Sequence, residues 1–216
     1  MTTTPKTIDL EVYSDYTCPW CYIGWARLRD AIDRAGASVR VDVTWRPFEI
    51  HPEVPLSGMP VEDLPYAPEQ WARMQAALRS AATAEGLEVG NRPKVSNTHR
   101  ALAAAEYVQS EEPLRFPAFH EALFKGYFAE GHDLGDPDVV TRIALGAGVG
   151  VERMNRELDD GYGEQALAET SARARALGIT GTPTFVFADR FAAAGAQPAD
   201  VLVRAMHMAL ATSQEE

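Results

Sequence analysis

The sequence predicts an α/β protein in which a long helical segment is inserted into a small core that contains the sheet. Two observations lead to this expectation: strand patterns lie near both ends of the chain, and the residues between them have a helical pattern. We expect the core to consist of residues 6–60 and 178–212, and the insertion to consist of residues 61–177. A chain of 216 residues is long enough for one domain with a large insertion.

The first part of the core is predicted to be a strand, a helix and a second strand. In the first strand, Ile8, Leu10 and Val12 alternate with polar residues, which is typical of a strand with one buried face. The helix begins near Pro19, since the missing N–H of proline does no harm in a first turn. Its apolar stripe contains Cys21, Trp25, Leu28 and Ile32. Valines and a tryptophan alternate with polar residues over 39–46, which completes a βαβ unit.

The insertion is predicted from prolines and from helical periodicity. Six prolines between Pro47 and Pro68 indicate an irregular connection. From Glu69 to about Leu177 the pattern is helical, and alanine-rich runs at 76–84 and 166–176 favour helix. Glycines and further prolines within this block mark the boundaries between helices.

The last part of the core is predicted to be a hairpin and a helix. Strand-forming residues return at 184–187, and a short second run follows at 191–194, as in a hairpin. The final helix extends from Pro198 to about Ala211. Its apolar stripe is expected to contain Val201, Leu202, Ala205, Met208 and Ala209.

Composition argues against several classes of function. The chain is 46% hydrophobic and 24% charged, which is typical of a globular protein with a substantial core. A net charge of −11 opposes a nucleic-acid or anionic-membrane partner. No stretch approaches the roughly 20 apolar residues of a membrane span. Because residues 1–7 are polar and resemble no signal peptide, we expect a cytoplasmic location, which is a reducing environment.

The two cysteines of the chain, Cys18 and Cys21, lie three residues apart where the first strand pattern gives way to the helix. A helix amino terminus stabilises a thiolate, so Cys18 is the expected nucleophile and Cys21 the expected resolving thiol. Two alternatives are weaker. A zinc site needs more ligands than two cysteines, and the five histidines show no ligand spacing. A structural disulfide across so short a loop would gain little stability, and a reducing compartment would open it.

Several segments together carry a resemblance to a known family. They are SDYTCPWCYIG at 14–24, FHEALF at 119–124, YFAEG at 127–131, GITGTPTFVF at 178–187 and GAQP at 195–198. These segments resemble the DsbA-like branch of the thioredoxin superfamily, and most closely its FrnE-type cytoplasmic thiol-disulfide oxidoreductases. The resemblance spans nearly the whole chain, and the joint pattern is far more specific than a lone Cys-X-X-Cys.

The resemblance implies a thioredoxin fold with a large all-helical insertion that acts as a lid. It also implies thiol-disulfide exchange through Cys18 and Cys21 on protein, peptide or small-molecule disulfides. In this fold a cis-proline faces the first cysteine, and the residue before it pairs with an extended substrate, which places Pro183 and Thr182 in the substrate site. Pro19 and Trp20 are expected to tune thiolate stability or to contact substrate. No bound cofactor is implied, glutathione is the candidate co-substrate, and a homodimer is left open.

Other residues have both a functional and a structural interpretation. Asp15 and Glu11 are candidate proton acceptors for Cys21, although surface acids are more common. Asn97 is expected to cap a helix, and it and Arg100 are candidate glutathione ligands. Four histidines are predicted to be surface or packing residues: His51, His99, His120 and His132. Three aromatic residues are expected in the core, with a place near the cleft as the alternative: Phe124, Tyr127 and Phe128.

Two other functions remain open at this point. One is a glutathione-dependent transferase or isomerase of the kappa or hydroxychromene-carboxylate type, which shares the helical insertion. Those enzymes typically have serine where Cys18 stands, so the presence of both cysteines favours redox chemistry. The other is a non-catalytic dithiol module, such as a metal-binding chaperone or a redox-gated binding partner.

Overall fold

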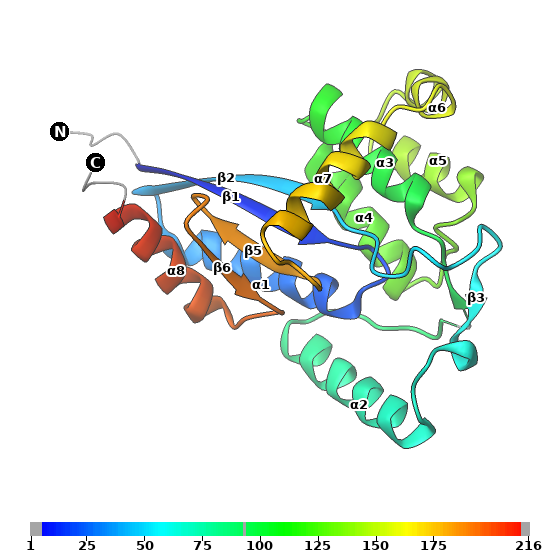
Figure 1. The fold of residues 1–216 in the computed structure, drawn as a ribbon, viewed down its shortest axis with the longest axis horizontal. Helices are drawn as coiled ribbons and strands as arrows, with labels where there is room; N and C mark the ends of the chain where they lie inside the picture. Colours follow the sequence, from blue (N-terminus) through cyan, green and yellow to red (C-terminus); the bar gives the residue numbers. More distant parts are fainter. Residues whose placement is uncertain (1–5, 93, 213–216) are drawn as a thin grey trace.

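The fold is built on one mixed sheet of four strands, in a computed structural model that describes residues 6–92 and 94–212 (Figure 1). The strand order is β2-β1-β5-β6. The strands are β1 (Lys6–Ser14), β2 (Val39–Pro47), β5 (Thr184–Phe187) and β6 (Phe191–Ala194). β1 pairs with β2 in parallel and with β5 in antiparallel orientation, and β5 and β6 form the predicted hairpin. The strand–helix–strand unit and the hairpin are therefore confirmed.

One face of the sheet is covered by α1 (Pro19–Ala35) and α8 (Ala199–Thr212). The alternating residues Ile8, Leu10 and Val12 of β1 point to this side and are at most 2% exposed. They pack with phenylalanines of β5 and with the apolar stripes of both helices. The alternation of apolar and polar residues in β1 therefore indicates a strand with one face in the core, as expected.

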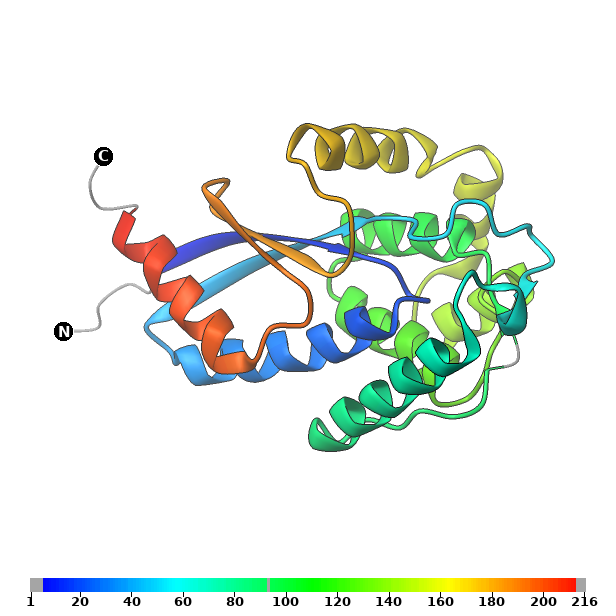
Figure 2. The same ribbon diagram turned by 60° about the horizontal axis from the view of Figure 1, so that its bottom comes forward.

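The opposite face of the sheet is covered by α7 (Glu164–Ala176), so that the sheet lies between two helical layers (Figure 2). Ala174 of α7 packs with Tyr13 of β1 and Val186 of β5. Because adjacent strand residues point to opposite faces, Tyr13 lies on the side away from Val12. Although α7 belongs to the insertion in sequence, it thus covers the second face of the sheet.

Among the described residues between β2 and β5, the structure has six α-helices, which confirms the helical insertion. They are α2 (Pro68–Ala84), α3 (His99–Glu111), α4 (Phe116–Phe128), α5 (Pro137–Gly146), α6 (Val151–Asp159) and α7. The insertion also holds two features that the sequence did not predict. One is a short antiparallel ladder between β3 (Met59–Pro60) and β4 (Lys94–Val95), and the other is a 3₁₀ turn, Val61–Asp63. The limits at residues 60 and 178 stay a prediction.

The insertion joins the core through an aromatic cluster between α1 and α4. Tyr22 stacks on Phe128 with ring centroids 5.0 Å apart, and Trp25 lies near Phe124 at 6.1 Å. Phe124 and Phe128 are fully buried, which agrees with their predicted place in the core. Such aromatic pairs stabilise an interface beyond the apolar area that they bury. The helix that carries the cysteines is therefore fixed against the insertion along its length.

The apolar stripe of α8 differs from the prediction at two positions, Met208 and Val201, since Val201 does not belong to the cluster that faces the sheet. Met208 is 60% exposed, and Met206 is fully buried instead. Leu202, Ala205, Met206 and Ala209 follow helical spacing and face the sheet, whereas position 208 lies outside this stripe. Among the helices of residues 6–92 and 94–212, none is both long and apolar enough to cross a membrane.

Candidate active site

Cys18 is the N-cap residue of α1, directly after the loop that leaves β1. Its carbonyl accepts hydrogen bonds from the backbone N–H groups of Cys21, at 3.0 Å, and of Tyr22, at 3.4 Å. Pro19 occupies the first turn, as the sequence predicted. The two cysteines lie 3.6 Å apart, and both are free thiols that are at most 3% exposed. The local sequence therefore places both sulfurs at the amino-terminal end of one helix.

The two thiols have opposite acidities. The hydrogen bond from the Cys21 thiol holds the pKa of Cys18 below its ordinary value, although burial opposes this effect. Burial raises the pKa of Cys21 well above its ordinary value, and the neighbouring Cys18 raises it further. Cys18 is therefore the more acidic of the two thiols, and Cys21 is the one that keeps its proton more strongly. This asymmetry is what a nucleophile and a resolving thiol require.

The loop before β5 reaches the first cysteine. The Cys18 thiol lies 3.5 Å from the carbonyl oxygen of Thr182 as a hydrogen-bond donor. The Thr182–Pro183 peptide bond is cis, and Pro183 is buried. A Cβ atom on Gly24 would come within 3.0 Å of the Pro183 ring, so a glycine at this position of α1 allows the close approach. Two segments separated by most of the sequence thus meet at the dithiol.

Asp15, one of the two candidate acids, is buried beside Cys21. Its backbone N–H lies 3.5 Å from the Cys21 sulfur. Its carboxylate accepts hydrogen bonds from the backbone N–H groups of Thr17, at 2.9 Å, and Ile50, at 2.8 Å, and from the hydroxyls of Thr17 and Thr98. Burial raises the pKa of Asp15 despite these hydrogen bonds. The Asp15 carboxylate therefore links the active-site loop to the segments that contain Ile50 and Thr98.

Glu11, the other candidate acid, is engaged elsewhere. Its carboxylate pairs with Arg46 at 2.6 Å and with Arg173 at 2.8 Å. Partial burial raises its pKa, but the hydrogen bonds from Arg173 and Arg46 outweigh this effect, so the pKa of Glu11 is lowered. Of the two acids, the structure places only Asp15 in contact with a cysteine.

A cavity of about 670 Å³ opens on Cys18. Pro19, Trp20 and Thr182 line it beside the thiol, so all but one of the sequence-predicted substrate residues face this space. The exception is Pro183, which packs against Gly24. Cavities of this size hold small-molecule or short peptide ligands.

The opposite wall of the cavity comes from segments that sequence reasoning did not single out. It contains apolar residues of α2 and of the preceding turn together with polar residues before β4: Leu64, Tyr66, Trp71, Met74, Leu78, Asn91 and Arg92. Tyr127 of α4 also lines it, so this residue is both a core residue and a cavity residue. The apolar stripe of α2 was the signal available in the sequence, but its direction depends on the tertiary structure.

The two candidate glutathione ligands of the insertion do not line this cavity. Arg100 forms an ion pair with Asp159 at 2.8 Å and a hydrogen bond with Asn155. The Asn97 side chain accepts the backbone N–H of His99 and donates to the carbonyl oxygen of Val54. The capping role predicted for Asn97 is thus confirmed in part, since its oxygen binds an N–H of the first turn of α3. The glutathione assignment of both residues stays a prediction, and the structure engages their polar groups in contacts within the fold.

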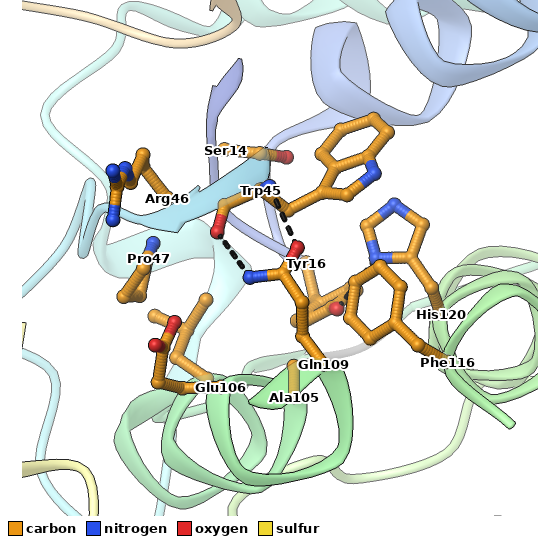
Figure 3. A pocket seen from close by; sticks show the side chains of 11 residues that line it. Ser14, Tyr16, Trp45, Arg46, Pro47, Ala105, Glu106, Gln109, Phe116 and His120 are labelled. Carbon is orange, nitrogen blue, oxygen red and sulfur yellow. Dashed lines mark hydrogen bonds between the residues drawn. The ribbon is translucent and has the colours of Figure 1, made fainter. Parts of the chain in front are cut away.

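A second, much smaller cavity lies behind β1 and has a volume of about 20 Å³ (Figure 3). His120 stands in its wall, within 2.7 Å of the Tyr16 hydroxyl and with its ring centroid 4.0 Å from that of Trp45. Gln109 closes another side through two hydrogen bonds with the backbone of Trp45, both drawn in Figure 3. Burial lowers the pKa of His120 to about 3, so the imidazole is neutral at ordinary pH. This space is too small for a substrate, and His120 is a packing residue.

The other three histidines are partly exposed and bind carboxylates. His99 contacts Glu49 at 3.0 Å and Glu164 at 2.7 Å, which raises its pKa although partial burial opposes the shift. His51 and His132 each lie near a glutamate two residues away in the sequence, Glu53 and Glu130. His51 also lines the Cys18 cavity, whereas His99 and His132 do not. These positions agree with the predicted surface or packing roles.

Comparison with known proteins gives the family. The model of the DSBA-like thioredoxin domain matches residues 9–207, which include both cysteines, the whole insertion and the loop before β5. The chain belongs to the DSBA-like thioredoxin domain family. It is a disulfide oxidoreductase of the DsbA-like class.

Three solved structures superpose over most of the chain. A probable DsbA oxidoreductase from Streptomyces coelicolor is 29% identical, with a TM-score of 0.83 over 94% of this chain and 89% of that one. A 2-hydroxychromene-2-carboxylate isomerase is 15% identical, with a TM-score of 0.74 over 96% and 98% of the two chains. The cytosolic disulfide reductase DsbM from Pseudomonas aeruginosa with GSH is 18% identical, with a TM-score of 0.62 over 96% and 98%. The last two likenesses, both under 20% identity, show the fold alone.

Proposed function

We propose that the protein reduces or forms disulfides in peptides, proteins or glutathione, with Cys18 as the nucleophile and Cys21 as the resolving thiol. The observation that carries the proposal is the position of the acidic thiol. Cys18, whose pKa is lowered by the hydrogen bond from Cys21, opens on the cavity, whereas Cys21 does not line it. A thiolate at the edge of a ligand-sized cavity is suited to attack a disulfide.

In the reductive direction the exchange has two steps. The Cys18 thiolate attacks one sulfur of the substrate, a new S–S bond forms, and the other substrate sulfur leaves as a thiolate that takes up a proton. Cys21 then loses its proton and attacks the Cys18 sulfur, which releases the second substrate thiol. The substrate has gained two electrons and two protons, and the protein holds a Cys18–Cys21 disulfide. Two equivalents of a thiol, such as glutathione, restore the dithiol, and the redox poise of the compartment sets the net direction.

We propose that Asp15 accepts the proton of Cys21 in the second step. Asp15 is buried, its backbone N–H contacts the Cys21 sulfur, and burial raises the pKa of its carboxyl. A base whose pKa approaches that of its partner transfers protons efficiently. Glu11 is unsuited because its carboxylate is occupied by two arginines.

The proposal places the reaction in the cytoplasm, with the chain nearest the FrnE-type branch of the family. Glutathione keeps thiols reduced in that compartment and would serve as co-substrate. Thr182 and Trp20 are proposed to contact the substrate, because both line the cavity beside Cys18. A homodimer stays a prediction.

The test uses the two cysteine variants with a disulfide substrate in a glutathione redox buffer. Cys18→Ser is expected to abolish turnover, because no thiolate remains at the cavity. Cys21→Ser is expected to lose turnover and to accumulate a mixed disulfide at Cys18, which mass spectrometry detects. Equal trapping by both variants would remove the assignment of roles.

The same variants separate this function from a glutathione-dependent transferase or isomerase. Such an activity does not need a resolving thiol, so it would survive Cys21→Ser. Conjugation or isomerisation that persists in this variant, together with no disulfide turnover by the unmodified protein, would overturn the proposal. A non-catalytic dithiol module would show neither activity.

A further inference from the structure

Arg92 is unlike the other partly buried arginines. Arg27, Arg46 and Arg100 are each paired with a carboxylate, at distances of 2.6, 2.6 and 2.8 Å. Within residues 6–92 and 94–212, Arg92 has no such partner, and its buried Nε atom lacks a hydrogen bond. Taking a guanidinium out of water without a counter-charge is costly. A charge held in this way is a candidate for binding an anion from outside the chain.

The aromatic side chains of α4 hold the guanidinium in place. Its central carbon lies 4.5 Å from the ring centroid of Phe128 and 5.6 Å from that of Tyr127. Stacking of this kind fixes a guanidinium while leaving its N–H groups available. Phe128 is itself stacked on Tyr22 of the cysteine helix, so Arg92 has a defined position relative to the dithiol.

Arg92 lines the same cavity as Cys18. The other charged residues around this cavity are Glu62 and Arg79, with His51 paired to Glu53 at 3.1 Å. Apart from Cys18 itself, the charged side chains that line the cavity are therefore two arginines and one glutamate, whereas the chain as a whole has a net charge of −11. Two guanidinium groups around one cavity of an acidic protein favour an anionic ligand.

We propose that Arg92 binds a carboxylate of the disulfide substrate, and so selects short peptide disulfides that carry carboxylates, the class to which glutathione disulfide belongs. The inference rests on the proposed function, since it assigns the substrate class of the same cavity. A guanidinium binds a carboxylate through two parallel hydrogen bonds, which orient the ligand as well as retain it. The volume of about 670 Å³ fits a ligand of this size.

The test compares two disulfides with the same thiol chemistry: glutathione disulfide and the form in which its carboxylates are ethyl esters. The rate at which each oxidises the reduced protein is followed by the loss of free thiols. Arg92→Gln is expected to slow oxidation by glutathione disulfide about 10- to 100-fold, the range for loss of a charged hydrogen-bonded pair. Oxidation by the ester should change less than about twofold. Arg92→Lys should give an intermediate rate, because lysine keeps the charge without the paired donors.

Arg29→Gln is the matched control. Arg29 also stacks on an aromatic ring, 4.7 Å from the centroid of Trp25, but it lies outside the cavity. The variant removes the same charge and should change neither rate. If Arg92→Gln does not fold, Arg92→Lys carries the same comparison between the two disulfides.

Each other result would overturn the inference. Equal losses with both disulfides would make Arg92 a structural residue, and no loss with glutathione disulfide would exclude the contact. If the unmodified protein reacts equally fast with both disulfides, the result supports the proposed thiol-disulfide exchange but contradicts the proposed role of Arg92 in binding a carboxylate. If neither disulfide oxidises the protein, the dithiol chemistry itself fails, which distinguishes the two proposals.

Discussion

The two cavities that border the active-site loop differ in size and in the side chains that line them. The front cavity, about 670 Å³, opens on Cys18 and has charged and apolar walls. The rear cavity, about 20 Å³, is enclosed by Tyr16, His120 and Trp45, and its histidine is neutral. The loop from Ser14 to Cys18 borders both. The loop at 14–18 therefore separates a cavity in which Cys18 can react with a substrate from an interior in which burial favours the neutral form of His120.

The difference between the two sides follows from solvent access and hydrogen bonding. Ser14 and Asp15 lie next to Cys21 on the interior side, where burial raises thiol, phenol and carboxyl pKa values alike. Cys18 escapes this trend because Cys21 and the start of α1 donate hydrogen bonds to its sulfur. Three changes test this contrast, in decreasing order of expected effect.

The largest effect is expected in thiol reactivity. Alkylation of Cys18 in Cys21→Ser should be more than about 100-fold faster at neutral pH than alkylation of Cys21 in Cys18→Ser, since Cys18 is the more acidic thiol and lines the cavity. The measurement is the rate of iodoacetamide modification against pH. An apparent pKa for Cys18 no lower than that for Cys21 would contradict the contrast.

Asp15→Asn should give the next largest effect. The amide replaces one carboxylate oxygen, so the backbone N–H of Ile50 or Thr17 loses its acceptor, and the free energy of unfolding should fall by about 2–3 kcal/mol. The loss of negative charge should also lower the pKa of Cys18 further, because the Asp15 carboxylate raises it. Urea unfolding and alkylation measure the two effects.

Glu11→Gln is the control for the Asp15 variant. Its carboxylate pairs with two partly exposed arginines, Arg46 and Arg173, and a glutamine can keep one of these hydrogen bonds, so the stability loss should stay below about 1 kcal/mol. Equal losses for the two variants would show that Asp15 does not act as a buried anchor of the loop.

His120 should make stability depend on pH. Its pKa is lowered to about 3 in the fold, against about 6.5 in the unfolded chain. As the pH falls below about 6.5 only the unfolded state takes up the proton, so the free energy of unfolding decreases, by about 2 kcal/mol at pH 5. His120→Gln should remove this component and give a flatter stability curve between pH 6 and pH 4.

The His120 measurement is a difference between two proteins, because Asp15 acts in the opposite direction. Its raised pKa means that the folded state gains stability as Asp15 takes up a proton. His207→Gln, at an exposed position of α8, is the control and should leave the curve unchanged. Parallel curves for the original protein and His120→Gln would contradict the neutral, buried state of this histidine.

The features that were predicted correctly from the sequence are those that depend on the local sequence alone. The alternation in β1, the cysteine pair at a strand–helix junction and the hairpin at 184–194 all depend on neighbours within a few positions. Asp15 and Glu11 could not be separated, because both are acids near the cysteines in sequence. Their difference arises from Ile50 and Thr98 on one side and from Arg173 on the other.

The sequence by itself determined the strands at both ends, the helical insertion and the dithiol, because these follow from periodicity, helix-start chemistry and composition. Only the tertiary structure decided what faces Cys18. Trp71 and Arg92 belong to segments far from the cysteines in sequence, and they reach the cavity because α2 and the chain before β4 pack beside α1. It also decided that Arg100, a candidate glutathione ligand in the sequence, forms an ion pair with Asp159. Long-range packing decides which charged side chain is left without an ion-pair partner, because the partners come from distant segments. No local sequence pattern can indicate this.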